Sequence, residues 1–585
     1  MVLLFLLLSY SLILYHQNEQ ISLRWQIYSV WLSINLFALV WSLFAIPKRL
    51  FLRFTQLLRE DWQIIVFILA VAFATRFLFL QIYPYVTLGD ELRDAGWQGL
   101  AFRQEVIPDV FAFGSYEGYG NFIPLISYYS SLFFGNSSMI YILPSAIVGI
   151  LSIMLTYAVG RVLGGKFIGV AAALFLATSY VHLHYSRTEL VVILDSLLTL
   201  FIFICVIVAL RVRYAYFLAG LILGFALHFY AGSRGMVFAA AVYLVLFTVQ
   251  NMLRDLRQKW QFVPFRNFIF SLFLIGSGII ISLGPRVNYF LKDKLIFRAG
   301  TITYIGEDPN FTQKTAIERI VFLSKSFERA FITYLWEPVG AHNGSYKGML
   351  LSFPVNWFFV VGFVAFVLGI NKSISIVWLI WAIFTITGTN QVFINAYESD
   401  HRLLSILPLL TLTSAYGYQK LASVLALRRT LYYFALAVII IPNLANYFIN
   451  RPSDVPYSWQ DYVFQDISQN FKSSPGDKYI VPPSDQPDIF AVESYDLKAL
   501  FHAYPKNAQI INKQGLLKAL KEREEKLGSA QIFTFEEIPQ LEFMQKREYK
   551  RVCGEAGLLS FYMCPTGYWG ELKYYVYNYV WSKRL

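Results

Sequence analysis

Long apolar stretches alternate with short polar turns along most of the first 450 residues. Most of these stretches run for roughly 18 residues or more, the length that a helix needs to cross a bilayer. A β-barrel strand would alternate apolar and polar residues instead. The pattern therefore predicts an all-α polytopic membrane protein. The roughly 13 predicted spans cover approximately residues 1–15, 26–46, 62–83, 138–160, 167–181, 190–210, 214–230, 236–250, 267–284, 352–370, 374–390, 403–420 and 430–448.

Basic residues gather in turns that lie on one side of the membrane if the spans alternate. These turns are residues 161–166 (RVLGGK), 211–213 (RVR) and 254–259 (RDLRQK), with Lys372 and Arg428–Arg429. Lys and Arg are enriched in cytoplasmic turns, so this side is predicted to be the cytoplasm. The N-terminus then lies inside and the C-terminus outside. The net charge of +12 thus indicates orientation, and no binding of nucleic acid is expected.

Composition agrees with this assignment. Hydrophobic residues make up 57% of the chain and charged residues 15%, whereas soluble domains carry about 25% charged residues. Of three cysteines, Cys205 lies within a predicted span and is interpreted as a small core residue. Cys553 and Cys564 lack the spacing of zinc ligands, and a disulfide between them in an oxidising compartment is left open.

Three parts are predicted along the chain. Residues 1–61 hold two N-terminal spans and a basic cytoplasmic segment, and residues 62–449 form a transmembrane module with outer loops at 84–137 and 285–351. Residues 450–585 are predicted to be a small extracytoplasmic α/β or α+β domain.

Within the C-terminal part, the pattern predicts one helix among strands. The helix is NKQGLLKALKEREEKLG (512–528). The predicted strands are KYIVPP (478–483), QIFTF (531–535) and LLSFYMC (558–564).

The first large polar loop on the predicted outer side begins with PYVTLGDELRDAG. It contains Asp90 and Glu91, with Asp94 one helical turn later. Acidic residues at the edge of an apolar span are costly unless they bind something or take part in chemistry. A carboxylate there can act as a general base or bind a cation. The alternative is an acidic first turn of a loop helix, stabilised by the helix dipole.

A second polar group lies in HYSRTELVVILDSLLTLF. If this segment is one helix, Asp195 lies about 12 Å deeper than Arg187. An acid at that depth must be paired or functional, and Arg76 of the third span is the alternative partner. His182 and His184 are two residues apart and do not share a helix face, so metal ligation is the less favoured interpretation.

Two further outer segments carry polar side chains next to a span. His401 and Arg402 stand at the start of one span, where Arg suits phosphate recognition or serves as an interfacial anchor. His342, Tyr346 and Lys347 precede another span, where they line a pocket or form an interfacial belt. The sequence has no P-loop, GxGxxG motif or ATP-binding domain to drive a pump.

Together these segments resemble the protein O-mannosyltransferase and lipid A aminoarabinose transferase group. The span with Arg76, Pro84 and GDELRDA, followed by EGYGNFIPLISYYSSLFFG, is similar to the group's first periplasmic loop. LHYSRTELVVILDSLLTLF is similar to its second conserved patch, with Arg187 and Asp195 matching. HRLLSILPLLTLTSAYGY resembles its late span entry. The resemblance covers roughly residues 62–420.

The resemblance implies a GT-C fold and a sugar donor on a polyprenyl phosphate. It implies that Asp90 is the base, that Glu91 assists and that Asp195 orients the site. Leu92 follows the acids where the group more usually has Ala, which weakens the match of Glu91 more than that of Asp90. The predicted donor-phosphate contacts are Arg187, Arg402, His401 and Lys347, and the predicted substrate-pocket residues are Asp94, Glu117, Tyr119, His342 and Tyr346.

The predicted function is therefore a membrane glycosyltransferase that transfers a sugar, with inversion, to a hydroxyl of a protein, lipid or glycan. The site and the C-terminal domain are expected outside a prokaryotic plasma membrane. No cofactor is required by the pattern, and a divalent cation is left open. The alternative is a multi-span transporter or flippase, which predicts inverted repeats and binding near the midplane. Neither feature is evident in the sequence. A non-catalytic scaffold for the C-terminal domain would not need the acids at the membrane edge.

Overall fold

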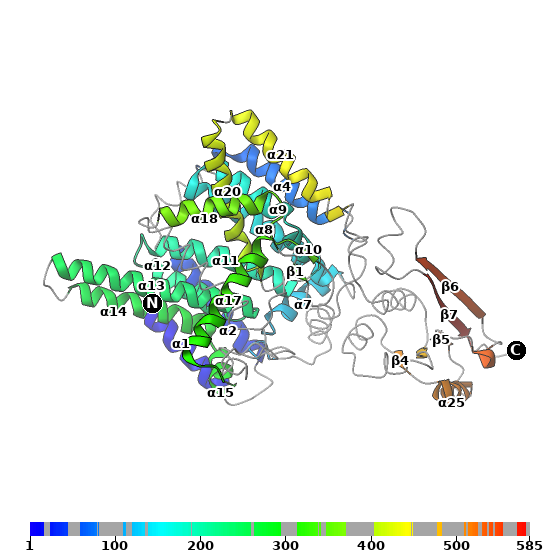
Figure 1. Cartoon of the computed structure of the whole chain (residues 1–585). Helices are drawn as coiled ribbons and strands as arrows, with labels where there is room; N and C mark the ends of the chain where they lie inside the picture. Colours follow the sequence, from blue (N-terminus) through cyan, green and yellow to red (C-terminus); the bar gives the residue numbers. More distant parts are fainter. Residues whose placement is uncertain are drawn as a thin grey trace.

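The structure is a computed structural model of the chain. In Figure 1, the described residues before 449 form mainly a bundle of helices. Most of the described strands belong to residues that follow 449 in the sequence. The structure describes all residues except 17–23, 45–55, 57–58, 79, 81–108, 113–119, 135–138, 189, 259–262, 294–312, 337–338, 341–346, 370–402, 427, 446, 449–476, 482–507, 511–512, 525–528, 535–537, 542–544, 554–569 and 581–585.

Helices occupy the predicted spans wherever the structure describes them. Five described helices are long and apolar enough to cross a membrane, or six if the bent pair of Lys166–Thr178 and Tyr180–Thr188 is one span. They confirm the predicted helical membrane protein, whereas the full number of spans stays a prediction because 374–390 lies outside the described residues. The helices at the predicted spans are α1 (Val2–His16), α2 (Arg24–Phe44), α4 (Trp62–Phe77), α8 (Met139–Gly164), α9 (Lys166–Thr178), α11 (Leu190–Ala209), α12 (Ala215–Ala226), α13 (Ala231–Gln258), α14 (Val263–Leu283), α18 (Val355–Leu368), α20 (Leu407–Val424) and α21 (Arg429–Ala445).

The predicted spans 167–181 and 190–210 leave residues 182–189 as a turn between them, and this expectation is wrong. Residues Tyr180–Thr188 form a short helix, α10, which is bent by 60° from α9. All nine residues of α10 are buried, so its polar side chains lie inside the bundle. The predicted outer loops also hold regular elements, namely α7 (Phe122–Phe134), α15 (Arg286–Asp293), α17 (Ala316–Leu335) and the paired strands β1 (Val339–Gly340) and β2 (Lys347–Gly348).

An ion cluster joins two segments that the charge pattern places on the cytoplasmic side. Arg161 donates from Nε to Oδ2 of Asp61 at 2.6 Å, and Nζ of Lys166 lies 3.2 Å from Oδ1. Asp61 immediately precedes α4, and its side chain is 2% exposed. Burial raises the pKa of Asp61, but the hydrogen bonds from Arg161, Tyr157 and Lys166 outweigh it, so the pKa lies below its ordinary value.

Glycines allow α12 and α14 to pack closely. A Cβ atom added to Gly278 of α14 would lie 2.5 Å from the carbonyl oxygen of Phe217 and 2.7 Å from the nitrogen of Leu221. Small residues at such crossings let helix backbones approach. For Gly276, on the same helix, no atom of the described residues lies within 4 Å of the equivalent position.

The C-terminal part contains a mixed sheet with the strand order β4-β3-β5-β7-β6. β3 pairs in parallel with β4 and β5, and β7 pairs antiparallel with β5 and β6. Leu516 and Leu520 of the helix pack with Tyr479 and Ile532 of the sheet in a small core. The elements are β3 (Asp477–Val481), β4 (Ala508–Ile510), α25 (Lys513–Glu524), β5 (Ser529–Thr534), β6 (Gln545–Cys553) and β7 (Gly570–Val580).

The predicted helix and two of the three predicted strands are therefore present in this part. The third predicted strand, 558–564, lies outside the described residues, as does Cys564. The disulfide and the domain boundaries stay predictions.

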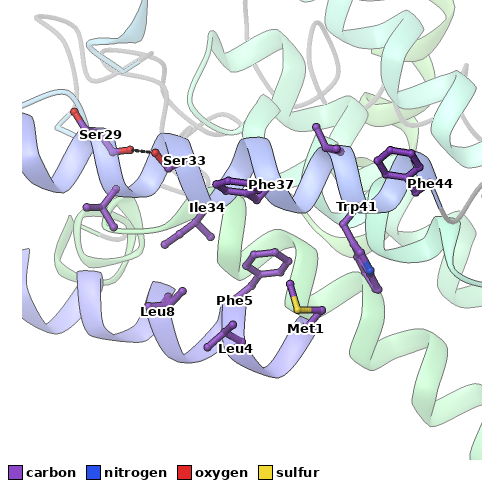
Figure 2. A pocket seen from close by; sticks show the side chains of 12 residues that line it. Met1, Leu4, Phe5, Leu8, Ser29, Ser33, Ile34, Phe37, Trp41 and Phe44 are labelled. Atoms are coloured by element: carbon purple, nitrogen blue, oxygen red, sulfur yellow. Dashed lines mark hydrogen bonds between the residues drawn. The ribbon is translucent and has the colours of Figure 1, made fainter.

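An apolar groove of about 670 Å³ lies between the N-terminal helices α1 and α2 (Figure 2). Phe5 lines it from α1, and Phe37 and Trp41 line it from α2. The hydroxyl of Ser33 donates to the main-chain oxygen of Ser29 at 2.8 Å, so this polar group is satisfied within its own helix. The groove offers apolar contacts and is not the candidate site.

Replacing Asp61 by Asn should lower the free energy of unfolding by roughly 1.5–3 kcal/mol at pH 7, because it weakens hydrogen bonds to charged partners. The measurement is the Tm in detergent. Since folding lowers the pKa of Asp61, the stabilisation is present above the ordinary carboxylate pKa of 3.8 and is lost as pH falls below it. Arg213→Gln, at an exposed arginine bonded to Asn267, is the control and should leave Tm unchanged. Equal Tm values for wild type and Asp61→Asn at pH 7 contradict the account.

Gly278→Ala should destabilise the protein, by roughly 1–3 kcal/mol, because the new methyl group forces α12 and α14 apart. Gly276→Ala is the matched control on the same helix and should be neutral or slightly stabilising. Thermal unfolding of the two variants makes the comparison. Indistinguishable Tm values would show that the close crossing is not present.

Candidate functional site

Buried polar side chains meet at the end of α4 opposite Asp61. Arg76, in the last turn of α4, is fully buried. Its Nη1 donates to the hydroxyl of Thr75 and to the carbonyl oxygen of Ala177, both at 2.6 Å, and its Nη2 lies 2.7 Å from Nδ1 of His182. Arg76 thus ties α4 to the bend between α9 and α10.

A second buried arginine also joins α4 to α10. Arg187 of α10 is 1% exposed. Its Nη1 donates to the carbonyl oxygens of Thr75 and Arg76, both at 2.9 Å. These carbonyls belong to the last turn of α4, which the helix cannot satisfy by itself. Its guanidinium also lies 5.4 Å from the ring centroid of Phe448.

Asp195 is fully buried in α11, close to the buried hydroxyl residues Ser196 and Thr199 in the sequence. Arg187 and Asp195 lie on α10 and α11, so the condition of one helix, on which the 12 Å depth depended, is not met. The alternative that Arg76 pairs with Asp195 is also wrong: among the described contacts, Arg76 bonds to Thr75, Ala177 and His182.

The contact with Arg76 defines the tautomer of His182. A guanidinium only donates hydrogen bonds, so Nδ1 of His182 is the acceptor and a neutral ring carries its proton on Nε2. Nε2 is buried and has no hydrogen-bond partner among the described residues. The described residues also include no group of three or more His, Cys, Asp or Glu side chains that could hold a metal ion.

The described end of the acidic loop forms a second polar cluster. Oδ1 of Asp109 accepts from the main-chain nitrogen of Phe111 at 2.9 Å, and Oδ2 accepts from the hydroxyl of Tyr289 on α15. The fully buried Arg286, first residue of α15, donates from Nη1 to the carbonyl oxygen of Phe111 at 3.3 Å and approaches that of Ala112 at 3.5 Å.

Aromatic side chains enclose this second cluster. Nε1 of Trp31 on α2 donates to the carbonyl oxygen of Ser282 at 3.1 Å. The Trp31 ring lies 5.4 Å from Phe111 and 5.3 Å from Phe122 between centroids. The N-terminal helix α2 therefore packs directly against the base of the outer loop and is not separate from the helical module.

Of the predicted site residues, the structure describes Arg187 and Asp195 with their side chains and Lys347 by its main chain in β2. Reasoning from the sequence missed Asp109, Arg286 and Tyr289, and it considered His182 only as a less favoured metal ligand and not as the partner of Arg76. Arg286 follows a Gly-Pro pair in a predicted outer loop, and a lone arginine there gives no distinguishing signal. The other predicted residues, Asp90, Glu91, Asp94, Glu117, Tyr119, His342, Tyr346, His401 and Arg402, lie outside the described residues.

Comparison with known proteins identifies one family. The model of the family "Dolichyl-phosphate-mannose-protein mannosyltransferase" matches residues 122–275. This stretch runs from α7 into α14 and includes Arg187 and Asp195. It covers less than half of the chain and does not include Asp90. Among curated proteins, a search finds no match.

Three solved structures are similar over most of the chain. The Archaeoglobus fulgidus oligosaccharyltransferase with Zn and sulfate has a TM-score of 0.44 and 13% identity, covering 80% of this chain and 67% of that one. AglB from Archaeoglobus fulgidus with an inhibitory peptide and a dolichol-phosphate gives 0.42 and 12%, covering 82% and 70%. ArnT from Cupriavidus metallidurans bound to undecaprenyl phosphate gives 0.40 and 12%, covering 88% and 97%.

Over residues 122–275 the chain is similar to the dolichyl-phosphate-mannose-protein mannosyltransferase family, and the resemblance to protein O-mannosyltransferases expected from the sequence motifs is confirmed there.

Proposed function

We propose that the protein is a membrane glycosyltransferase that moves a sugar from a polyprenyl-phosphate donor to a hydroxyl acceptor at the outer face of the membrane. The observation that carries this proposal is the family match over residues 122–275. The matched stretch contains the buried Arg187 and Asp195, a cation and a carboxylate of the kinds that the proposed chemistry needs. The match favours a transferase over the transporter alternative.

The proposed chemistry needs a base and a set of cations. A polyprenyl phosphate is already a good leaving group, so no strong general acid is required. A carboxylate takes the proton of the acceptor hydroxyl as its oxygen attacks the anomeric carbon. The bond from that carbon to the phosphate oxygen breaks, and cations stabilise the departing phosphate. One direct displacement of this kind inverts the configuration of the sugar.

We assign the base to Asp90, with assistance from Glu91, and an orienting role to Asp195. Arg187 is assigned to the departing phosphate. The acceptor hydroxyl belongs to a protein, lipid or glycan. The remaining proposed phosphate contacts are Arg402, His401 and Lys347, and the proposed pocket residues are Asp94, Glu117, Tyr119, His342 and Tyr346.

The described geometry adds one donor to this proposal. Nε2–H of His182 is fully buried within the same α10 helix as Arg187. A phosphate or sugar oxygen would supply the acceptor that this group lacks among the described residues. A divalent cation, if one takes part, would be bound by the carboxylates Asp90, Glu91 and Asp94, since carboxylate oxygens are the ligands that such ions prefer.

Asp90→Asn should lower the rate of sugar transfer by roughly 10²–10⁴-fold, the usual contribution of a general base. The assay uses purified protein in detergent, a labelled polyprenyl-phosphate sugar and a hydroxyl acceptor, with EDTA added in a parallel sample to test for a cation. Glu60→Gln, on a half-exposed acid near Arg161 at the other end of α4, is the control. Full activity of Asp90→Asn would reject the assigned base, and no transfer by wild type from any such donor would reject the proposed function.

Arg187→Gln should weaken binding of a polyprenyl phosphate about tenfold or more, because it removes a charged donor near the phosphate. The dissociation constant is measured with the lipid phosphate alone, in parallel with Tm. Arg213→Gln serves as the exposed control. Unchanged affinity in a folded Arg187→Gln protein would restrict Arg187 to closing the end of α4.

A further inference from the structure

Two buried arginines bind main-chain carbonyls on either side of the segment that carries the predicted base. Arg187 binds the carbonyls of Thr75 and Arg76, just before this segment begins. Arg286 binds those of Phe111 and Ala112, just after it. Both arginines come from helices later in the chain, α10 and α15, so tertiary contacts fix both ends of the segment.

The second of these attachments is the more elaborate one. The carboxylate of Asp109 accepts from Tyr289, while its main-chain oxygen accepts from Nδ2 of Asn121 at 2.7 Å. The main-chain nitrogen of Gly120 donates to the carbonyl oxygen of His228 at 2.9 Å. We call the group of Asp109, Gly120, Arg286 and Tyr289 the exit anchor, since it holds the chain where it leaves the acidic loop.

The N-terminal helices α1 and α2 contact the exit anchor and the segment that it holds. Nδ2 of Asn288 on α15 donates to the carbonyl oxygen of Ile13 on α1 at 3.1 Å. Trp31 of α2 packs against Phe111 within the anchored segment. The helices that precede the region of family resemblance are thus part of the support for the outer loop.

We propose that the exit anchor is a positioning device for the transfer reaction, with Arg286 and Tyr289 as positioning residues. This inference rests on the proposed function. A buried charge is rarely the most stabilising choice for a packed interior, but it can select one arrangement of the chain. The contacts of the exit anchor fix the position of residues 109–112. The segment that carries Asp90 must therefore connect to this position. Displacing a catalytic group by about 1 Å can lower a rate by about 10²-fold.

Glycine at position 120 is part of the same device. A Cβ atom there would collide with Nη1 of Arg286 and lie 2.9 Å from both Cζ of Arg286 and the carbonyl oxygen of His228. Gly120→Ala therefore displaces Arg286 without removing its charge. Gly276→Ala is the matched control, because the equivalent position on α14 is open.

The test compares Gly120→Ala and Tyr289→Phe with Gly276→Ala and with Tyr214→Phe, whose tyrosine is 55% exposed. Three measurements are made on full-length protein: the kinetics of sugar transfer (kcat and the donor KM), Tm, and deuterium exchange of peptides covering residues 109–122. In the two anchor variants we expect kcat to fall by about tenfold or more with the donor KM within about twofold. Exchange should rise in those peptides, and Tm of Tyr289→Phe should stay close to wild type. The controls should match wild type in all three.

Unchanged kcat and unchanged exchange in both anchor variants would overturn the proposal. A loss of activity that only follows the loss of folded protein would overturn it as well, because the role would then be structural. If wild type transfers no sugar, the proposed function fails, and with it the catalytic part of this inference. In that case, deuterium exchange in the anchor variants still shows whether the exit anchor holds residues 109–122.

Discussion

The arrangement depends on two arginines that are buried inside an apolar helix bundle. Arg76 and Arg187 meet at the last turn of α4, where four main-chain carbonyls of a helix have no partner within it. Arg187 satisfies two of these carbonyls, and Arg76 reaches across to Ala177 and His182. The bend between α9 and α10 makes this possible, because it turns a short polar helix into the interior. The two arginines, the last turn of α4 and the bend between α9 and α10 therefore form one structural unit.

This unit and the exit anchor have the same role at two positions in the chain, before and after the acidic loop. A polar loop that carries several acids must leave and re-enter an apolar bundle at defined positions. In each case a buried guanidinium binds carbonyl oxygens of the chain next to the loop. The fork of donors in arginine suits this task better than the single ammonium of lysine. A hydrogen bond from Asn288 then ties α15 to α1, and Trp31 of α2 packs against Phe111, whose carbonyl Arg286 binds.

Much of the helical fold could be predicted from the sequence because apolar runs of membrane length are a strong signal. The positions of α8, α11 and α14 follow from that pattern. The same signal cannot reveal α10, since its nine residues include two histidines and an arginine and read as a polar turn. Arg187 and Asp195 were found through a motif, whereas Arg286 and Tyr289 act through partners far away in the sequence. Their role depends on tertiary contacts that no local pattern encodes.

If the proposed function is right, the junction of α4 and α10 receives the phosphate of a polyprenyl-phosphate donor. Photocrosslinking with a polyprenyl phosphate that carries a diazirine next to the phosphate, followed by peptide mapping, locates that phosphate. We expect labelling within residues 62–77 and 180–209, abolished by excess unlabelled polyprenyl phosphate. Labelling confined to the apolar groove between α1 and α2, or labelling that the unlabelled lipid does not displace, would contradict it.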